Sequence, residues 1–197
     1  MKHIIPVFVL LAVTLSACVQ TPVETETEQA WDTRRDELMR LENWDLKGRI
    51  SIRSENYSGS GSLYWAQHKD EYDIRVIASL PGRVYEFSGS GGVISLQTSC
   101  ESVIQTEDAE TLLNQALEWY FPVSELVYWI RGLPTPALPV HQLLFDEANR
   151  VSTLSQAGWS VHYKRYIGID GTSMPERLDL ENDHMHVRLF VRQWNLP

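Results

Sequence analysis

The sequence predicts a mainly β protein of the α+β class. We expect one strongly curved antiparallel sheet of about ten to eleven strands, with a short helical lid over an apolar cavity. Apolar and polar residues alternate with period two over most of the chain, which places successive side chains on opposite faces of a strand. The segments between these runs are short, which favours antiparallel neighbours. One helical stretch separates an earlier group of strands from a later one.

The earlier group contains the first five expected strands. In the first of them, Leu46 and Ile50 share one face, and Lys47 lies on the other. The glycine-rich segment 89–92 is typical of a hairpin turn between the last two strands. The strands are expected over residues 45–53, 58–67, 71–78, 84–90 and 93–98.

The helical interruption is expected to contain two short helices that cover the concave face of the sheet. The first helix is expected over residues 109–117, with Thr106 as its N-cap. The second is expected over residues 123–131. It begins after Pro122, whose missing N–H is no loss at a helix start, and it ends at Gly132.

The later group contains the remaining five strands, expected over residues 140–145, 151–156, 158–166, 176–181 and 185–194. Most apolar residues on the strand faces are expected to form an ordinary core. A single curved sheet covered by two short helices need not fill its interior with side chains, as lipid-binding barrels show. We therefore expect a cavity for acyl chains, lined by residues from Ile50, Trp65, Ile74, Phe87, Leu126, Trp129, Ile130, Val161 and Leu189.

The N-terminus is organised like a bacterial lipoprotein precursor. A short basic start precedes an apolar stretch from Ile4 to Leu15, which is shorter than the ~20 residues of a membrane-spanning helix. Leu-Ser-Ala-Cys at 15–18 resembles the lipobox, in which the Cys is acylated. We expect a signal peptide over 1–17 and lipidation of Cys18. The alternative is a plain secretory signal with a Cys there by chance.

The mature chain is expected to have two parts. Residues 18–29 are acidic and Thr-rich and lack apolar periodicity, which is typical of a tether. Residues 30–197 are expected to form a single domain, which opens with a short amphipathic helix over 30–41.

Composition excludes several classes of function. A net charge of −9 argues against nucleic-acid binding, which needs clustered Lys and Arg. His184 and His186 have strand spacing, but no third ligand is near in sequence, so we interpret them as a polar hairpin rather than a metal site. Catalytic motifs and cofactor motifs are also missing from the sequence. We therefore expect neither an enzyme nor a cofactor.

Several short motifs occur in one order across the chain and resemble those of the outer-membrane lipoprotein receptor LolB family. They are Trp44-x-x-x-Gly48-Arg49-Ile50, Trp65-x-Gln67, Leu80-Pro81-Gly82, Phe121-Pro122-Val123-Ser124-Glu125-Leu126-x-x-Trp129-Ile130-x-Gly132-x-Pro134, Gln156-x-Gly158-Trp159-x-Val161-x-Tyr163, Met174-Pro175-x-x-Leu178-x-Leu180 and Arg192-x-Trp194. The resemblance covers about residues 30–197.

The resemblance implies a half-barrel with a helical lid and an apolar cavity. It implies that the protein receives triacylated lipoproteins from the periplasmic carrier LolA and inserts them into the outer membrane, working as a monomer. In the family, a loop with the pattern Asn-Pro-Leu-Gly carries a protruding Leu for membrane delivery. Residues 79–82 are Ser-Leu-Pro-Gly here, so Leu and Pro are exchanged and Leu80 is the matching residue type. Val19, the residue after the lipidated Cys, resembles the sorting signal of outer-membrane lipoproteins. We therefore expect an outer-membrane protein whose domain faces the periplasm of a Gram-negative bacterium.

Two other functions remain as alternatives. A lipid-anchored periplasmic binding protein for a free lipid or other hydrophobic ligand would share the lipobox and the half-barrel, but it would need no exposed apolar loop. An anchored hydrolase would need a Ser, a His and an acid that converge in a cleft.

Overall fold

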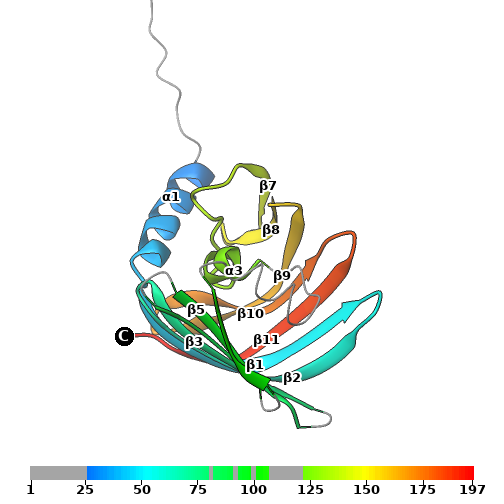
Figure 1. Ribbon diagram of the computed structural model, residues 1–197. Helices are drawn as coiled ribbons and strands as arrows, with labels where there is room; N and C mark the ends of the chain where they lie inside the picture. Colours follow the sequence, from blue (N-terminus) through cyan, green and yellow to red (C-terminus); the bar gives the residue numbers. More distant parts are fainter. Residues whose placement is uncertain (1–25, 80–81, 91–92, 99–100, 107–121) are drawn as a thin grey trace, which may run out of the picture.

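The computed structural model describes residues 26–79, 82–90, 93–98, 101–106 and 122–197. Within these ranges the chain forms one eleven-stranded antiparallel sheet and two helices (Figure 1). The predicted fold class is thereby confirmed. None of the helices in the described ranges has the length and apolar character needed to cross a membrane.

The sheet consists of two meanders that join side by side. The first contains β1 (Asn43–Ser54), β2 (Ser58–His68), β3 (Glu71–Ala78), β4 (Val84–Ser90), β5 (Val93–Thr98) and β6 (Glu101–Thr106). The second contains β7 (Val140–Phe145), β8 (Val151–Gln156), β9 (Trp159–Ile169), β10 (Thr172–Glu181) and β11 (Met185–Asn195). The first strand pairs with the last, so the order is β6-β5-β4-β3-β2-β1-β11-β10-β9-β8-β7, with β6 and β7 at the edges.

The inner face of the curved sheet carries the core. Along β1, buried Trp44, Leu46, Ile50 and Ile52 alternate with residues that face outward, as a pleated strand requires. Gly48 continues this inner row at a register shift between β1 and β11, and a Cβ there would overlap the carbonyl of the facing strand. This close approach allows the sheet to curl tightly where the two meanders join.

The two described helices lie on the concave side of the sheet. Helix α3 (Val123–Trp129) sits inside the curve, and α1 (Glu26–Met39) lies near β7 and β8 (Figure 1). The Trp31 ring of α1 contacts the Phe145 ring of β7, with ring centroids 5.2 Å apart. Both helices therefore pack against the inner face. The sequence predicted this position for the helix at 123–131, but it predicted no particular face for the N-terminal helix.

Some predicted element boundaries were wrong. The acidic segment expected to be a tether already begins α1 at Glu26 rather than at Ala30, because acidic residues suit the first turn of a helix. Helix α3 ends at Trp129 rather than 131, with Ile130 as its C-cap. Strand β10 begins at Thr172 rather than 176, because Pro175 lies beside a register shift, where a strand tolerates proline.

One strand was not predicted and one helix is not described. Within the described part of the chain, strand β6 pairs only with β5. Its sequence, Glu-Ser-Val-Ile-Gln-Thr, places two apolar residues side by side instead of alternating them. It therefore gives little period-two signal. The helix expected over 109–117 lies outside the described residues.

Candidate apolar binding site

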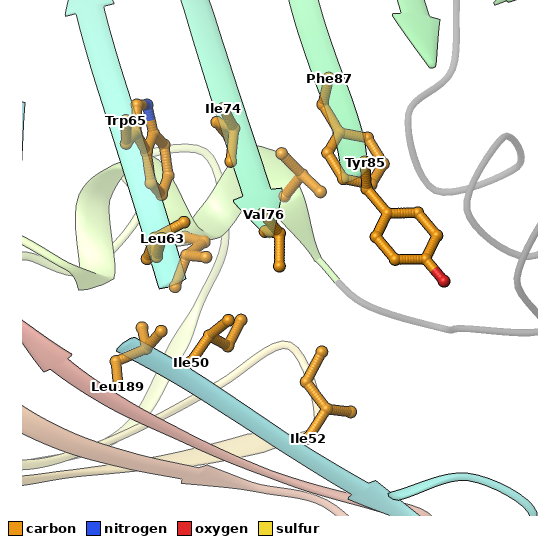
Figure 2. Close-up of a pocket in the computed structure, with 11 residues that line it drawn as sticks. Ile50, Ile52, Leu63, Trp65, Ile74, Val76, Tyr85, Phe87 and Leu189 are labelled. Atoms are coloured by element: carbon orange, nitrogen blue, oxygen red, sulfur yellow. The ribbon is translucent and has the colours of Figure 1, made fainter. Parts of the chain in front are cut away.

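An apolar pocket lies between the first meander and α3 (Figure 2). Among the described residues, all the side chains that line it are aliphatic or aromatic, and no carboxylate, imidazole or thiol is among them. Its free volume is about 60 Å³. The lining residues are Ile50, Ile52, Leu63, Trp65, Ile74, Val76, Tyr85, Phe87, Val123, Leu126 and Leu189.

Strand register builds one wall of the pocket. Trp65 of β2, Ile74 of β3 and Phe87 of β4 are direct cross-strand partners, which places them in one row across three strands. Leu63, Val76 and Tyr85 form a second row, one pleat along. Because side chains on one face of a sheet recur every second residue, the two rows form a continuous apolar surface.

Helix α3 supplies the opposite wall through Val123 and Leu126. It has seven residues, and a helix this short is not stable without tertiary contacts. The Tyr163 hydroxyl of β9 donates a hydrogen bond to the Trp129 carbonyl at the end of the helix, at 2.8 Å. Burial raises the pKa of Tyr163 well above its usual value, so the hydroxyl keeps its proton and remains a donor.

A buried amide fixes the chain after α3. The Gln156 side chain is 1% exposed. Its Oε1 accepts hydrogen bonds from Trp129 Nε1 at 3.0 Å and from the Thr135 N–H at 2.8 Å. Its Nε2 donates to the carbonyls of Thr135 and Leu138, both at 2.9 Å. All four hydrogen-bonding positions of this amide are occupied, so β8 holds both the helix end and the following loop.

Arg131 ties the same region to α1. Its Nη1 donates to the carbonyls of Leu38 and Leu41 at 3.1 and 2.9 Å, and its Nε donates to the Val127 carbonyl at 3.0 Å. Burial lowers the pKa of the guanidinium, which stacks over the Tyr128 ring with its carbon 5.4 Å from the centroid. A buried cation that binds carbonyls at the C-terminal end of a helix is favourably placed.

The structure brings together six of the nine side chains predicted to line a cavity: Ile50, Trp65, Ile74, Phe87, Leu126 and Leu189. Trp129, Ile130 and Val161 are fully buried but do not line this pocket. Trp129 instead binds Gln156, and Val161 pairs with Leu154 and Leu180 in the second meander. These three belong to the core beside the pocket.

Other lining residues of the pocket were not predicted. Four of them follow the same period-two alternation as the predicted residues: Ile52, Leu63, Val76 and Tyr85. The alternation therefore placed them on the inner face, but it could not show that they line the pocket. Cys18 and Leu80 lie outside the described residues.

The fold and the pocket define a class of proteins: open, curved antiparallel sheets whose concave face is suited to apolar ligands. Two solved structures share this fold. A LolA superfamily protein from Nitrosomonas europaea aligns at a TM-score of 0.53 with 11% identity, over 86% of this chain and 93% of that one. A DUF1329 family protein from Desulfovibrio piger aligns at a TM-score of 0.53 with 8% identity, over 86% and 92% of the two chains.

Sequence comparison identifies the family. The chain belongs to the LolB family, described as "Outer membrane lipoprotein LolB", which matches residues 42–194. An outer-membrane lipoprotein LolB from Pseudomonas paraeruginosa is 37% identical over 84% of this chain and 80% of its own length. Its counterpart from Ectopseudomonas mendocina is 34% identical over 98% and 96%. The protein is thus an outer-membrane lipoprotein of a family that works in lipoprotein trafficking.

Proposed function

We propose that this protein accepts lipoproteins from the periplasmic carrier LolA in its apolar pocket and inserts them into the outer membrane. The observation that carries this proposal is a pocket with only aliphatic and aromatic side chains on the concave face of the sheet. An acyl chain of ~15 CH₂ groups, each worth ~0.8 kcal/mol, is unfavourable in water by about 12 kcal/mol. A cargo that crosses the periplasm therefore needs such a surface at each step.

The pocket is narrow in the described form. Its free volume of about 60 Å³ is below the ~300 Å³ at which pockets for small ligands begin. Uptake of an acyl chain therefore requires the wall to widen. Helix α3 is the wall element with the fewest backbone bonds to the rest of the fold, because it is not part of the sheet.

We further propose that Cys18 carries the lipid that anchors the protein, and that the domain works without it as a receptor. The buried core extends from Trp31 to Trp194, so a chain that begins at residue 19 retains all of it. Such a chain is suited to a transfer assay in solution.

The test uses a substitution that fills the pocket without introducing charge. Val76 lines the pocket, whereas Ile77, the next residue of β3, points to the other face. With a labelled lipoprotein supplied on purified LolA, Val76→Trp should lower uptake at least about tenfold, equivalent to a loss of roughly 1.4 kcal/mol of binding. Ile77→Trp, the matched control, should stay within about twofold of the wild type.

Two outcomes of this assay would contradict the proposal. Uptake by Val76→Trp at the wild-type rate, with the fold intact by circular dichroism, would refute the pocket as the acyl site. If the wild type binds a free fatty acid but takes no lipoprotein from LolA, the protein is instead a binding protein for free lipid.

A further inference from the structure

A row of basic side chains crosses the outer, convex face of the sheet. Phe190 of β11 has a direct cross-strand partner on each side, Arg49 of β1 and Arg177 of β10. On the next strand, Arg165 of β9 is the direct partner of Arg177. The three arginines are exposed and Phe190 is half-buried. The Arg165 guanidinium carbon lies 5.7 Å from the centroid of the Phe190 ring.

Two further cations extend this row. Lys47 lies two residues before Arg49 on the same face of β1, and Arg192 lies two residues after Phe190 on β11. Both are exposed. We call the six residues together the basic face: Lys47, Arg49, Arg165, Arg177, Phe190 and Arg192.

Little negative charge from the protein neutralises the basic face. Arg165 forms an ion pair with Glu176, but the part of the chain that the structure describes offers no ion-pair partner to Lys47, Arg49, Arg177 or Arg192. Other acids on the outer face of these strands are engaged elsewhere: Asp179 binds Arg188, and Glu181 lies beside His162. Asp45 alone lies near the end of the face without such a partner.

The arrangement is unfavourable for the isolated protein. Arg177 and Arg165 are direct cross-strand partners, and like charges in that position destabilise a sheet. The chain as a whole carries a net charge of −9, so the positive charge of the basic face is opposite in sign to that of the whole protein. A site that keeps such repulsion is suited to an external anion.

The position of the face favours a membrane as the source of that anion. If Cys18 is lipidated, as proposed above, the eight residues from Cys18 to Glu26 span at most about 28 Å, which keeps the domain next to the bilayer. Arg34 of α1 binds the Ser173 carbonyl of β10, four residues before Arg177. The path from Glu26 to the face is about 12 Å along the helix and about 13 Å along the strand, with the Arg34 side chain joining the two. This distance is comparable to the full length of the tether.

We propose that the basic face docks on the anionic phospholipid headgroups of the membrane in which the protein is anchored. Guanidinium groups match the geometry of phosphate oxygens, and the half-buried Phe190 offers an apolar contact between them. The acidic remainder of the protein is repelled by the same surface, so docking fixes the orientation of the domain. This inference rests on the proposed lipid anchor but not on cargo transfer.

The test measures binding of the chain that begins at residue 19 to sedimented vesicles. The vesicles contain phosphatidylethanolamine with or without phosphatidylglycerol. The test variant is Arg49→Gln/Arg177→Gln/Arg192→Gln. The matched control is Arg40→Gln/Lys69→Gln/Arg75→Gln, which removes the same charge from exposed positions outside the basic face.

We expect the wild type and the control to bind vesicles with phosphatidylglycerol, and to release them as salt is raised. The test variant should bind about a hundredfold more weakly, since each basic residue near an anionic surface contributes ~1 kcal/mol. Its melting temperature should equal or exceed that of the wild type, because the Arg177–Arg165 repulsion is removed.

Three results would overturn the proposal. The first is equal binding by the test and control variants, and the second is equal wild-type binding to vesicles with and without phosphatidylglycerol. The third is unchanged vesicle binding by the test variant together with weaker uptake of cargo from LolA, which would assign the face to an acidic protein partner. Failure of the wild type to take cargo refutes the proposed function alone and leaves the vesicle result standing.

Discussion

At the scale of single residues, Gln156 shows how a polar side chain can position an apolar pocket. Its amide satisfies the Trp129 indole, the Thr135 N–H and two carbonyls, all on the segment that carries α3. The described residues that line the pocket are aliphatic or aromatic. The position of α3 therefore depends on hydrogen bonds made behind the pocket.

Replacement of this amide should be costly. Gln156→Leu keeps the volume but leaves buried donors and carbonyls without partners, each worth about 1–3 kcal/mol. We expect the free energy of unfolding, measured by urea titration, to fall by about 3 kcal/mol. Gln193→Leu removes one exposed hydrogen bond, to Asn195, and should change stability by less than about 0.5 kcal/mol. Equal losses in the two variants would contradict the proposed role of Gln156.

The sequence predicted which residues lie on the inner face of the sheet better than it predicted which of them line the pocket. Period-two alternation assigned Ile50, Trp65, Ile74 and Phe87 to the inner face, where they line the pocket. The same alternation cannot tell a side chain that lines the pocket from one that is packed elsewhere on the inner face. Val161 is an example: it does not line the pocket, because β9 lies two strands beyond β11, whereas Leu189 of β11 pairs directly with Ile50 of β1.

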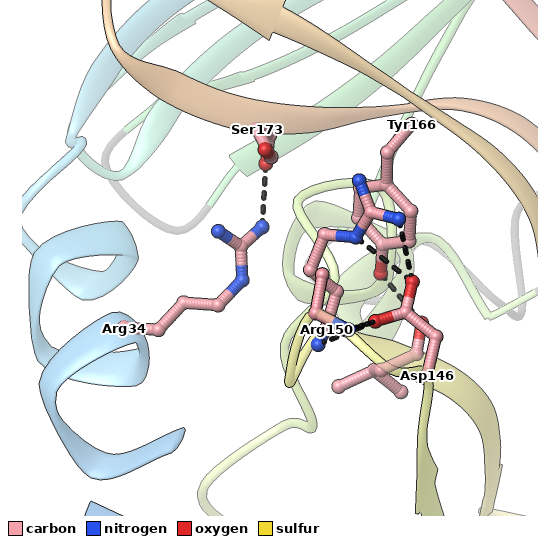
Figure 3. A network of polar contacts seen from close by, with 7 residues as sticks. Arg34, Asp146, Arg150, Tyr166 and Ser173 are labelled. Carbon is pink, nitrogen blue, oxygen red and sulfur yellow. Dashed lines mark hydrogen bonds and ion pairs between the residues drawn. The ribbon is translucent and has the colours of Figure 1, made fainter. Parts of the chain in front are cut away.

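At the scale of elements, α1 is fastened to the second meander by a polar network (Figure 3). The Tyr166 ring of β9 has Arg34 of α1 over it at 5.7 Å and Arg150 over it at 4.6 Å. Arg150 forms an ion pair with Asp146 at 2.7 Å. Burial raises the pKa of Tyr166, so its hydroxyl stays protonated and donates to the Val151 carbonyl. The helix nearest to the proposed lipid anchor is thus held by cation–π contacts and charged hydrogen bonds.

This network should weaken in acid. Burial tends to raise the pKa of Asp146, but hydrogen bonds from the Arg150 side chain and from the backbone N–H groups of Arg150 and Ala148 outweigh it, and the net pKa lies below its ordinary value of 3.8. A carboxyl with a lowered pKa stabilises the fold above its unfolded-state pKa and loses that contribution as the pH falls through its folded-state pKa.

A substitution tests this pH dependence. Asp146→Asn should be less stable than the wild type at pH 7 in a urea titration, because the charge that Arg150 needs is missing. The difference should shrink as the pH falls below 3.8, the ordinary pKa of the group, since the wild type then also loses its charge. A difference that stays constant from pH 7 to pH 3 would refute the assignment.

Element boundaries were predictable where the pattern was regular. Ten of the strands alternate clearly enough to be placed from the sequence, whereas β6 at the sheet edge does not. The start of α1 was misjudged because an acidic, Thr-rich stretch suits both a tether and a helix N-terminus. In both cases local sequence alone did not decide, because tertiary packing stabilises short or weak elements.

At the scale of the whole molecule, the sheet places the pocket next to one hairpin end. Val76 and Tyr85 form the pocket row nearest to the connection between β3 and β4. That connection starts after Ala78 and ends before Val84. If the pocket holds an acyl chain, as proposed above, a chain that leaves along these strands passes Ala78 and Val84, the residues that flank this connection.

We propose that Leu80 acts in delivery rather than uptake. An exposed leucine that enters the bilayer gains from burial of its side chain, and Leu80→Glu would place a charge there instead. We expect Leu80→Glu to take labelled lipoprotein from LolA within about twofold of the wild type, yet to deliver it to vesicles at least about tenfold more slowly, equivalent to roughly 1.4 kcal/mol.

The matched control for Leu80 is an apolar residue that is exposed far from this hairpin. Leu144, on the edge strand β7, is 48% exposed, so Leu144→Glu adds the same charge on a surface outside the pocket end. It should leave both uptake and delivery unchanged. If Leu80→Glu delivers cargo at the wild-type rate, or if Leu144→Glu slows delivery to the same extent, membrane insertion does not depend on Leu80. The exchanged order of Leu80 and Pro81 would then have moved that role to another residue.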